Sequence, residues 1–180
     1  MIYDFAYSVL FNGADNALNY QTRDPIFYSV LNSLDKKPVK IFQIGAIETF
    51  NINWRVGSGW SDIIFGQYIK KYGGKLTIAD INLDNIAHSY LAASKIGYEV
   101  ELLYGDAINF ITKEDYDIYY LDGSNDPQET LDQFNKVKDK KCIILVDDFS
   151  IKGTLLQDKG FNIINVANQV GVLDLRNVNL

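Results

Sequence analysis

Acidic residues follow two strongly apolar segments in the second half of the chain. Asp122 comes directly after 118–121, and the pair Asp147 and Asp148 comes directly after 142–146. If both segments are strands of one sheet, the three carboxylates meet at one edge and repel one another unless a positive group lies between them or one is protonated. Hard oxygen ligands suit Mg²⁺ or Ca²⁺, and a metal ion there would polarise a substrate hydroxyl. The alternative for any single aspartate is a turn cap or contact with solvent, so the prediction depends on the cluster.

Two glycine-containing segments are candidates for a ligand that approaches the backbone closely. Gly45 follows the β-rich run 39–44, and Gly57 and Gly59 precede a helical pattern that begins near Ser61. Glycine permits close approach, and a helix N-terminus offers N–H donors. The alternative is that these glycines only form a turn and a loop. Neither GxGxxG nor the Walker pattern occurs, which argues against NAD and ATP sites.

Two further acids follow other β-rich runs. Asp80 lies 21 positions after Gly59 and suits the hydroxyls of a ribose, because a carboxylate can accept from both. Its alternative role is the N-cap of the following helix, for which Asn82 is at least as well placed. Asp106 either caps the next short helix or accepts from the exocyclic amine of a purine, and both roles can hold together.

The elements that position these residues follow one another regularly from Pro38 onward. The expected strands are 39–44, 75–79, 99–104, 116–121 and 141–146, and the expected helices are 61–71, 83–96, 106–112 and 126–138. This alternation predicts an α/β fold with a doubly wound, mostly parallel sheet and helices on both faces. The last two strand-like runs, 161–166 and 170–175, are too close for a crossover helix, so they predict an antiparallel hairpin.

The first 38 residues differ from the rest because they are rich in aromatic side chains. They contain two short helical patterns, 3–11 and 24–34, and the second begins with Asp24 as N-cap and Pro25 at the first helical position. We therefore expect 1–38 to be an N-terminal helical extension and 39–180 to be the main domain. The whole chain is expected to form one structural domain.

Composition and charge indicate a globular protein and argue against several classes of partner and location. The 180 residues are 47% hydrophobic and carry a formal charge of −6, enough for one sizeable core. The negative balance disfavours nucleic acid and anionic membranes as partners. The single cysteine excludes an internal disulfide framework, the beginning of the chain shows no signal-peptide pattern, and the longest apolar run is far shorter than the roughly 20 residues of a membrane span. We expect a soluble cytoplasmic protein.

Taken in order, these motifs resemble the class I S-adenosylmethionine-dependent methyltransferases over about residues 39–176. The resemblance implies a seven-stranded Rossmann-like sheet whose antiparallel seventh strand lies between strands five and six. It also implies that the first glycine segment holds the methionine part of S-adenosylmethionine, that the acid after strand two holds the ribose, and that Gly105-Asp106-Ala107 contacts the adenine. The cofactor-binding residues implied are Gly45, Gly57, Gly59, Trp60, Ser61, Asp80, Asp106, Ala107 and Asp122.

The motifs after strands four and five are most similar to metal-dependent O-methyltransferases related to catechol O-methyltransferase. This likeness implies that Asp122, Asp147 and Asp148 bind a divalent cation such as Mg²⁺, and that Asp122 and Asp147 are catalytic. The reaction implied is methyl transfer to an oxygen of a small hydroxylated molecule, such as a sugar or a phenol. The expected partner is therefore a small-molecule acceptor, and a homodimer is left open.

The chain departs from the family's pattern at several positions. Gln43 replaces the usual acid of the first motif, and Ile47 and Thr49 stand where further glycines are expected. Ser124 and Asn125 replace an Asp-His pair of some members, so no base for neutral pH is evident, although a metal-bound hydroxyl would not require one. The second hypothesis is a degenerate methyltransferase fold that binds a partner protein or a nucleoside without catalysis. A nicotinamide dehydrogenase is disfavoured because the fingerprint glycines are missing.

Overall fold

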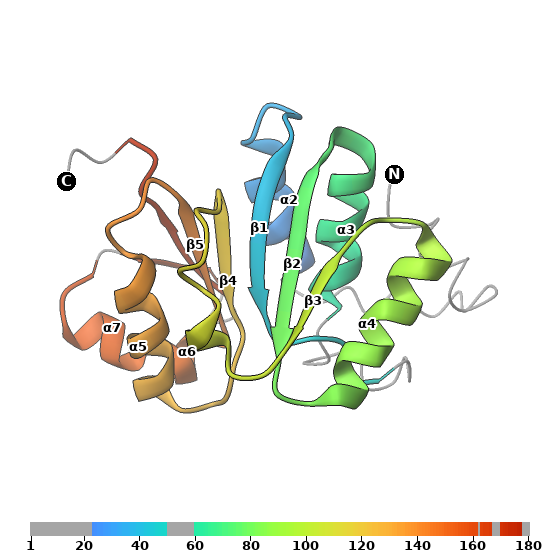
Figure 1. Ribbon diagram of the computed structural model, residues 1–180. Coiled ribbons are helices and arrows are strands. Elements are labelled where there is room, and N and C mark those ends of the chain that lie inside the picture. The colour runs from blue at the N-terminus through green and yellow to red at the C-terminus, as the bar shows by residue number, and fades with distance from the viewer. Residues whose placement is uncertain (1–22, 50–59, 162, 167–169, 178–180) are drawn as a thin grey trace.

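The computed structural model describes residues 23–49, 60–161, 163–166 and 170–177, and these form a layered α/β structure (Figure 1). Its strands are β1 (Val39–Ile44), β2 (Gly74–Asp80), β3 (Glu101–Tyr104), β4 (Ile118–Leu121), β5 (Ile143–Asp147), β6 (Ile164–Val166) and β7 (Val170–Asp174). Its helices are α2 (Asp24–Asn32), α3 (Ser61–Tyr72), α4 (Leu83–Ile96), α5 (Pro127–Val137), α6 (Phe149–Lys152) and α7 (Thr154–Asp158), with a 3₁₀ turn η2 (Ala107–Asn109).

The seven strands form one sheet in the order β3-β2-β1-β4-β5-β7-β6. The first five strands in this order, β3, β2, β1, β4 and β5, are parallel to one another. Strand β7 is antiparallel to both β5 and β6. The predicted doubly wound sheet is therefore confirmed, and so is the C-terminal hairpin that inserts its last strand beside β5. The chain runs outward from β1 through β2 to β3 and then returns to β4 on the other side of β1, which makes the carboxyl ends of β1 and β4 a topological switch point.

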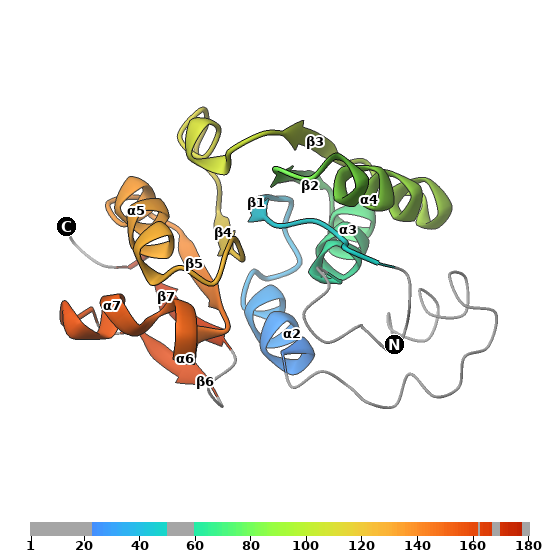
Figure 2. The ribbon, with the colours of Figure 1, turned by 90° about the horizontal axis from the view of Figure 1, so that it is seen from below.

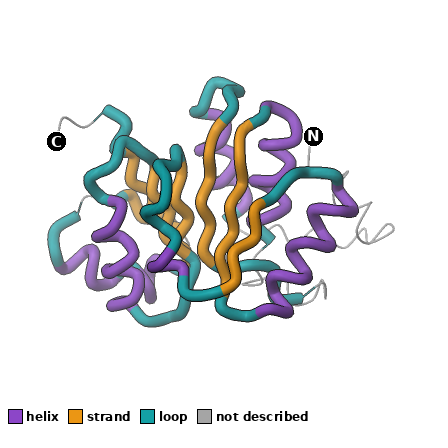
Figure 3. Tube along the Cα trace, in the orientation of Figure 1, coloured by secondary structure: helices purple, strands orange, loops and turns teal. Residues whose placement is uncertain are grey.

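Helices cover both faces of the sheet, as Figures 2 and 3 show. α2, α3 and α4 lie on one face, whose core includes Ile118 and Tyr120, and α5, α6 and α7 lie on the other, whose core includes Tyr119 and Leu121. Alternate residues of β4 thus enter different cores, because successive side chains of a strand point to opposite faces. This explains why β4 and β5 are buried throughout and read as continuous apolar runs.

The segment before β1 contributes α2 to the core. Phe27 is buried and meets the rings of Phe65 and Tyr120 edge to face. The helix begins at Asp24 with Arg23 as N-cap, so the predicted cap at Asp24 is one residue too late. The other helix expected in this region, 3–11, lies outside the described residues, and the boundary at residue 38 stays a prediction.

Two local expectations need correction. The segment 106–112 forms only the 3₁₀ turn η2 and not a helix, because its apolar residues span too few turns to offset the cost of helix nucleation. Between β5 and β6 the sequence patterns predict no element, yet α6 and α7 lie there. With four and five residues, both helices are too short to show a helical period in the sequence.

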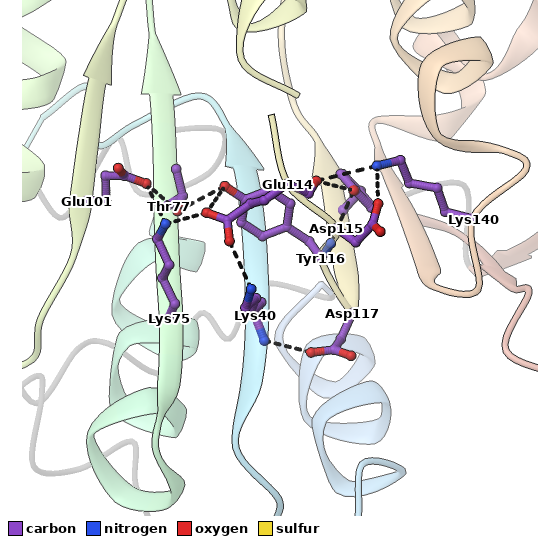
Figure 4. Close-up of polar contacts among 10 residues, drawn as sticks. Lys40, Lys75, Thr77, Glu101, Glu114, Asp115, Tyr116, Asp117 and Lys140 are labelled. Atoms are coloured by element: carbon purple, nitrogen blue, oxygen red, sulfur yellow. Dashed lines mark hydrogen bonds and ion pairs between the residues drawn. The ribbon is translucent and has the colours of Figure 1, made fainter. Parts of the chain in front are cut away.

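A charged network joins the amino ends of several strands (Figure 4). Glu114 accepts from Lys75 and, at 2.9 Å, from Lys40, while Lys75 also pairs with Glu101 at 3.0 Å. Hydrogen bonds from Lys75 and then Lys40 lower the pKa of Glu114 to about 2. The groups are partly exposed, so such pairs stabilise the fold modestly. They lie at the edge of the sheet opposite the carboxyl ends of the strands and are therefore structural.

Within the described parts of the chain, none of the helices combines the length and the apolar character that a membrane span requires.

Candidate functional site

A cavity of about 610 Å³ opens at the carboxyl ends of the parallel strands. Seven of the residues singled out in the sequence line it: Gly45, Asp80, Asp106, Ala107, Asp122, Asp147 and Asp148. They come from the ends of β1, β2, β3, β4 and β5, so the sheet brings together residues that are up to 103 positions apart in the chain. This is the place where open α/β sheets bind ligands.

The end of β1 approaches the end of β4 very closely at Gly45. Its φ is +87°, and a Cβ atom built there would lie 2.5 Å from the backbone oxygen of Asp122. Its N–H donates to the carbonyl of Ala79 at 2.9 Å. Glycine is therefore required at this turn for two reasons, its conformation and the lack of space for a side chain.

Replacing Gly45 by Ala is expected to lower the free energy of unfolding by about 1–3 kcal/mol, because the left-handed conformation and the overlap with Asp122 are both unfavourable. Gly160→Ala is a matched control, since Gly160 also has a positive φ, +77°, but has no atom within 4 Å of the position that a Cβ would take. Urea unfolding of both variants measures the difference, which isolates the contact with Asp122. Equal losses of unfolding free energy in the two variants would show that the contact with Asp122 does not contribute to the cost at Gly45.

Asp80 at the end of β2 organises the neighbouring loops. Its Oδ2 accepts from the Ala46 N–H at 2.8 Å and from Asn85 Nδ2 at 3.1 Å, and its Oδ1 accepts from the Asn82 N–H at 2.7 Å. Asn82 is the N-cap of α4, so the alternative role of Asp80 as cap is wrong. A carboxylate offers about four acceptor positions, which leaves room for about one further hydroxyl rather than two.

At the end of β3, too, an aspartate accepts a backbone hydrogen bond from the following loop. Asp106 caps the turn η2 by accepting from the Ile108 N–H at 3.0 Å, and it also lines the cavity with Ala107. Gly105 donates its N–H to the carbonyl of Asp80 at 2.9 Å. The loops after β1, β2 and β3 are thus connected to one another by hydrogen bonds.

A buried carboxyl group is connected to the loop that contains Gly45 through hydrogen bonds of two other side chains. Asp62, from α3, is fully buried and accepts from Gln43 Nε2 and Ser89 Oγ. Gln43 also donates to the carbonyl of Gly45 at 2.7 Å, and Ser89 Oγ accepts from the Ile47 N–H at 3.1 Å. Burial raises the pKa of Asp62 to about 7, although both hydrogen bonds act in the opposite direction. Gln43, which stands where the first motif usually has an acid, is therefore hydrogen-bonded to an acid that α3 contributes.

The acids after β4 and β5 are paired with two basic residues of the chain. Lys152 Nζ lies 2.5 Å from Asp122 Oδ1, and Arg23 donates to Asp147 Oδ2 at 2.8 Å and also to Asp148. Burial raises the pKa of Asp147 well above its usual range, and Asp122 adds to this effect while Arg23 and Lys152 oppose it. Burial lowers the pKa of Lys152, but the attraction of Asp122 and Asp147 outweighs burial, so this pKa lies above its ordinary value.

These contacts do not fit the divalent ion that the resemblance implies. The carboxylates of Asp122, Asp147 and Asp148 already have ammonium or guanidinium partners. In the described ranges, no group of three or more acidic, histidine or cysteine side chains is arranged to hold a metal. The expected metal site thus finds no support, since its ligands are used in ion pairs.

Other polar residues at the rim are held by one another. Ser124 Oγ donates to Glu129 Oε2 at 2.5 Å and accepts from the Asp126 N–H at 3.2 Å. Gly123 lies beside them, because a Cβ there would come within 2.7 Å of Glu129 Oε1. Ser124 therefore holds the conformation of this loop, at the position where some of the methyltransferases that the motifs resemble have an acid.

Four of the predicted cofactor residues are not seen at the cavity. Gly57 and Gly59 lie outside the described residues, so their role stays a prediction. Trp60 and Ser61 are buried at the start of α3 and do not belong to the lining.

Sequence reasoning missed the two cations and the buried acid. Arg23 lies at the start of a helical pattern, and Lys152 lies in a segment where no element is expected from the sequence. Asp62 follows Gly59, Trp60 and Ser61, but the surrounding sequence indicates only a helix. The one available signal was electrostatic, since three acids predicted at one edge require positive partners.

The described residues that line the cavity are mostly acidic. Among them, Lys152 carries an ammonium, and seven carry carboxyl groups, namely Glu48, Asp80, Asp106, Asp122, Glu129, Asp147 and Asp148. A lining of this charge attracts cationic ligands and repels phosphates. It therefore disfavours dinucleotides and nucleoside triphosphates, in agreement with the missing glycine fingerprints.

No family model matches the chain, and no curated protein matches it significantly. Solved structures do resemble it. A methyltransferase from Geobacter sulfurreducens is 14% identical with a TM-score of 0.61, over 94% of this chain and 88% of the other. The SAH-bound Podospora anserina methyltransferase PaMTH1 is 16% identical with a TM-score of 0.60, over 94% and 91%. A mutant of MtNAS in complex with S-adenosylmethionine is 12% identical with a TM-score of 0.54, over 95% and 73%. At these identities the likeness concerns the architecture, and the chain has the Rossmann-like fold of solved methyltransferases.

Proposed function

We propose that the chain is an S-adenosylmethionine-dependent methyltransferase that uses the cavity at the carboxyl ends of β1 to β5. The observation that carries this proposal is the convergence of Gly45, Asp80 and Asp106 on one cavity. The three residues come from successive strand ends, in the order that the resemblance assigns to the methionine, ribose and adenine parts of the cofactor. The methyltransferase fold and the acidic lining support the same assignment, because the cofactor carries a positive sulfonium.

The chain's residues fit this ligand in distinct ways. Gly45 lines the cavity, and its lack of a side chain lets the ends of β1 and β4 approach each other there. Asp80 retains an acceptor position for a ribose hydroxyl, and Asp106 can accept from an adenine amine while it caps η2. When bound, S-adenosylmethionine supplies an electrophilic methyl group on its sulfonium.

The acceptor is proposed to be a small hydroxylated molecule that is methylated on oxygen. It would lie beside Asp122, Asn125 and Lys152, the part of the lining that the cofactor-binding loops leave free. The acidic lining disfavours an anionic acceptor, so a neutral alcohol, sugar or phenol suits it better. Rate enhancement would come mainly from positioning the acceptor oxygen in line with the methyl group.

Cofactor binding tests the proposal directly. Isothermal titration calorimetry with S-adenosylmethionine and with S-adenosylhomocysteine is expected to show binding, and Asp80→Ala should weaken it by about 10- to 100-fold, because a hydrogen bond to a charged acceptor is lost. Asp84→Ala is the control, since Asp84 is an exposed acid at the start of α4. Absence of heat with both ligands would overturn the proposal.

A second candidate function is a methyltransferase-fold protein that binds a partner or a nucleoside without catalysis. The altered first motif, with Gln43 at the place of the usual acid, and the lack of a histidine after Asp122, where Ser124 is held by Glu129, favour it. Cofactor affinity separates the two candidates. A protein that has lost catalysis and no longer uses the cofactor should not retain tight binding of S-adenosylmethionine.

A further inference from the structure

We propose that Arg23 and Lys152 are permanent counter-ions of Asp122, Asp147 and Asp148, and that they exclude divalent cations from this site. The chain would thus have two of its own side chains in the place where the metal-dependent enzymes it resembles hold a metal ion. This inference goes beyond the proposed function, because it concerns cation binding whether or not methyl transfer occurs.

Lys152 is placed where an ion would have to bind. It comes from α6, its side chain is only 3% exposed, and its ammonium lies 2.5 Å from Asp122 Oδ1 on the wall of the cavity. Removing one partner of a buried ion pair is strongly unfavourable, because the other charge stays buried without compensation. A cation approaching Asp122 would therefore have to displace Lys152 and leave it buried without its counter-ion.

Arg23 holds the other two acids together. It is 6% exposed at the start of α2, and its two terminal nitrogens donate to different carboxylates, NH1 to Asp147 at 2.8 Å and NH2 to Asp148. The planar guanidinium suits such a double contact, and it keeps its charge at all accessible pH values. The bonds span 124 and 125 positions of the chain, so they form only when α2 is packed on the sheet.

The balance of charge leads to the same conclusion. Three carboxyl groups face two cations, so the cluster carries at most one net negative charge. A divalent ion added to the intact cluster would reverse that sign and would lie next to two buried positive groups. Like charges at short distance repel strongly in a buried environment.

The test is a titration of the full chain with Mn²⁺, followed by electron paramagnetic resonance of the free ion. The unmodified protein is expected to show no binding at concentrations up to about 1 mM, a range that covers most carboxylate sites for divalent ions. Lys152→Met should create a site that binds Mn²⁺ at least about tenfold more tightly, because three carboxylates then face Arg23 alone. Lys152→Arg should restore the exclusion, and Lys136→Met on the exposed face of α5 is the control for losing one positive charge.

Two results would overturn the inference. One is micromolar binding of Mn²⁺ to the unmodified protein that Asp148→Asn abolishes. The other is a folded Lys152→Met variant that excludes Mn²⁺ as well as the unmodified protein does. If Lys152→Met fails to fold, tight binding of Mn²⁺ to the unmodified protein or to Lys152→Arg still contradicts the inference. Calorimetry with S-adenosylmethionine on the same samples separates this question from the proposed function. A protein that binds neither Mn²⁺ nor S-adenosylmethionine contradicts the proposed function but not the exclusion of divalent cations.

Discussion

Between pH 4 and pH 8 the protein is expected to lose about 4 kcal/mol of unfolding free energy through one carboxyl group, that of Asp62. Its pKa in the folded protein is about 7, against an ordinary value of 3.8. The cause is burial, because Asp62 is fully shielded from water and no cation pairs with it among the described residues.

The direction follows from the two pKa values. Below about pH 4 the group is protonated in both the folded and the unfolded state, so it has no effect on stability. Between 3.8 and about 7 the unfolded state releases the proton while the folded state retains it, and stability falls as the pH rises. Above about pH 7 both states are ionised, and the full cost of a buried charge remains.

Asp62→Asn removes this titration and tests the expectation. Urea unfolding of the variant and the unmodified protein at several pH values should show that the variant gains relative stability as the pH rises. The total gain should be about 4 kcal/mol, even though the amide loses one of the two hydrogen bonds at low pH. Asp84→Asn, an exposed acid, should give a curve parallel to that of the unmodified protein. A parallel curve for Asp62→Asn as well would show that Asp62 titrates normally.

The same group bears on the cavity. Gln43 and Ser89 connect Asp62 to the backbone of Gly45 and Ile47, so a change in its ionisation acts on the loop that leads from β1. We therefore expect the affinity for S-adenosylmethionine to vary between pH 6 and pH 8 in the unmodified protein and to vary less in Asp62→Asn.

Replacing Phe27 by Ala is expected to lower the unfolding free energy by about 3–5 kcal/mol. Phe27 is 2% exposed, and its ring centroid lies 5.4 Å from that of Phe65 and 5.2 Å from that of Tyr120. The substitution removes both edge-to-face contacts and leaves a cavity between α2, α3 and β4. Alanine is a good helix former, so the loss reports on packing and not on the stability of the isolated helix.

Thermal and urea unfolding measure this effect, with Ser29→Ala on the exposed side of α2 as control. The result also tests whether residues 24–32 belong to the main fold. A loss of about 3–5 kcal/mol in a single cooperative transition means that α2 is integral to the core. A separable extension would give either a small effect or a second transition, and Arg23 would then lose its position beside Asp147 without unfolding the sheet.

Much of the architecture was predictable because it depends on local patterns. β1 and α4 have the predicted bounds, since an apolar run and a helical period with an N-cap at Asn82 are signals within a few residues. The hairpin was predictable because the two runs are too close in sequence for any other connection. The helix expected at 106–112 was wrong because so short an apolar pattern does not offset the cost of helix nucleation. Helices α6 and α7 were missed because they are shorter than the stretch over which a helical period can be recognised in a sequence.

The sequence by itself determined which acids leave the strands at one edge of the sheet, because the alternation of strands and helices implies parallel strands and the acids come directly after them. Only the tertiary structure decided what these acids meet. Arg23 and Lys152 reach Asp147 and Asp122 from helices on opposite faces of the sheet, and the Asp62 network connects α3 with β1 and α4. Such pairings depend on how distant segments pack, and the position of a charge in the sequence carries no information about the partner that packing will bring to it.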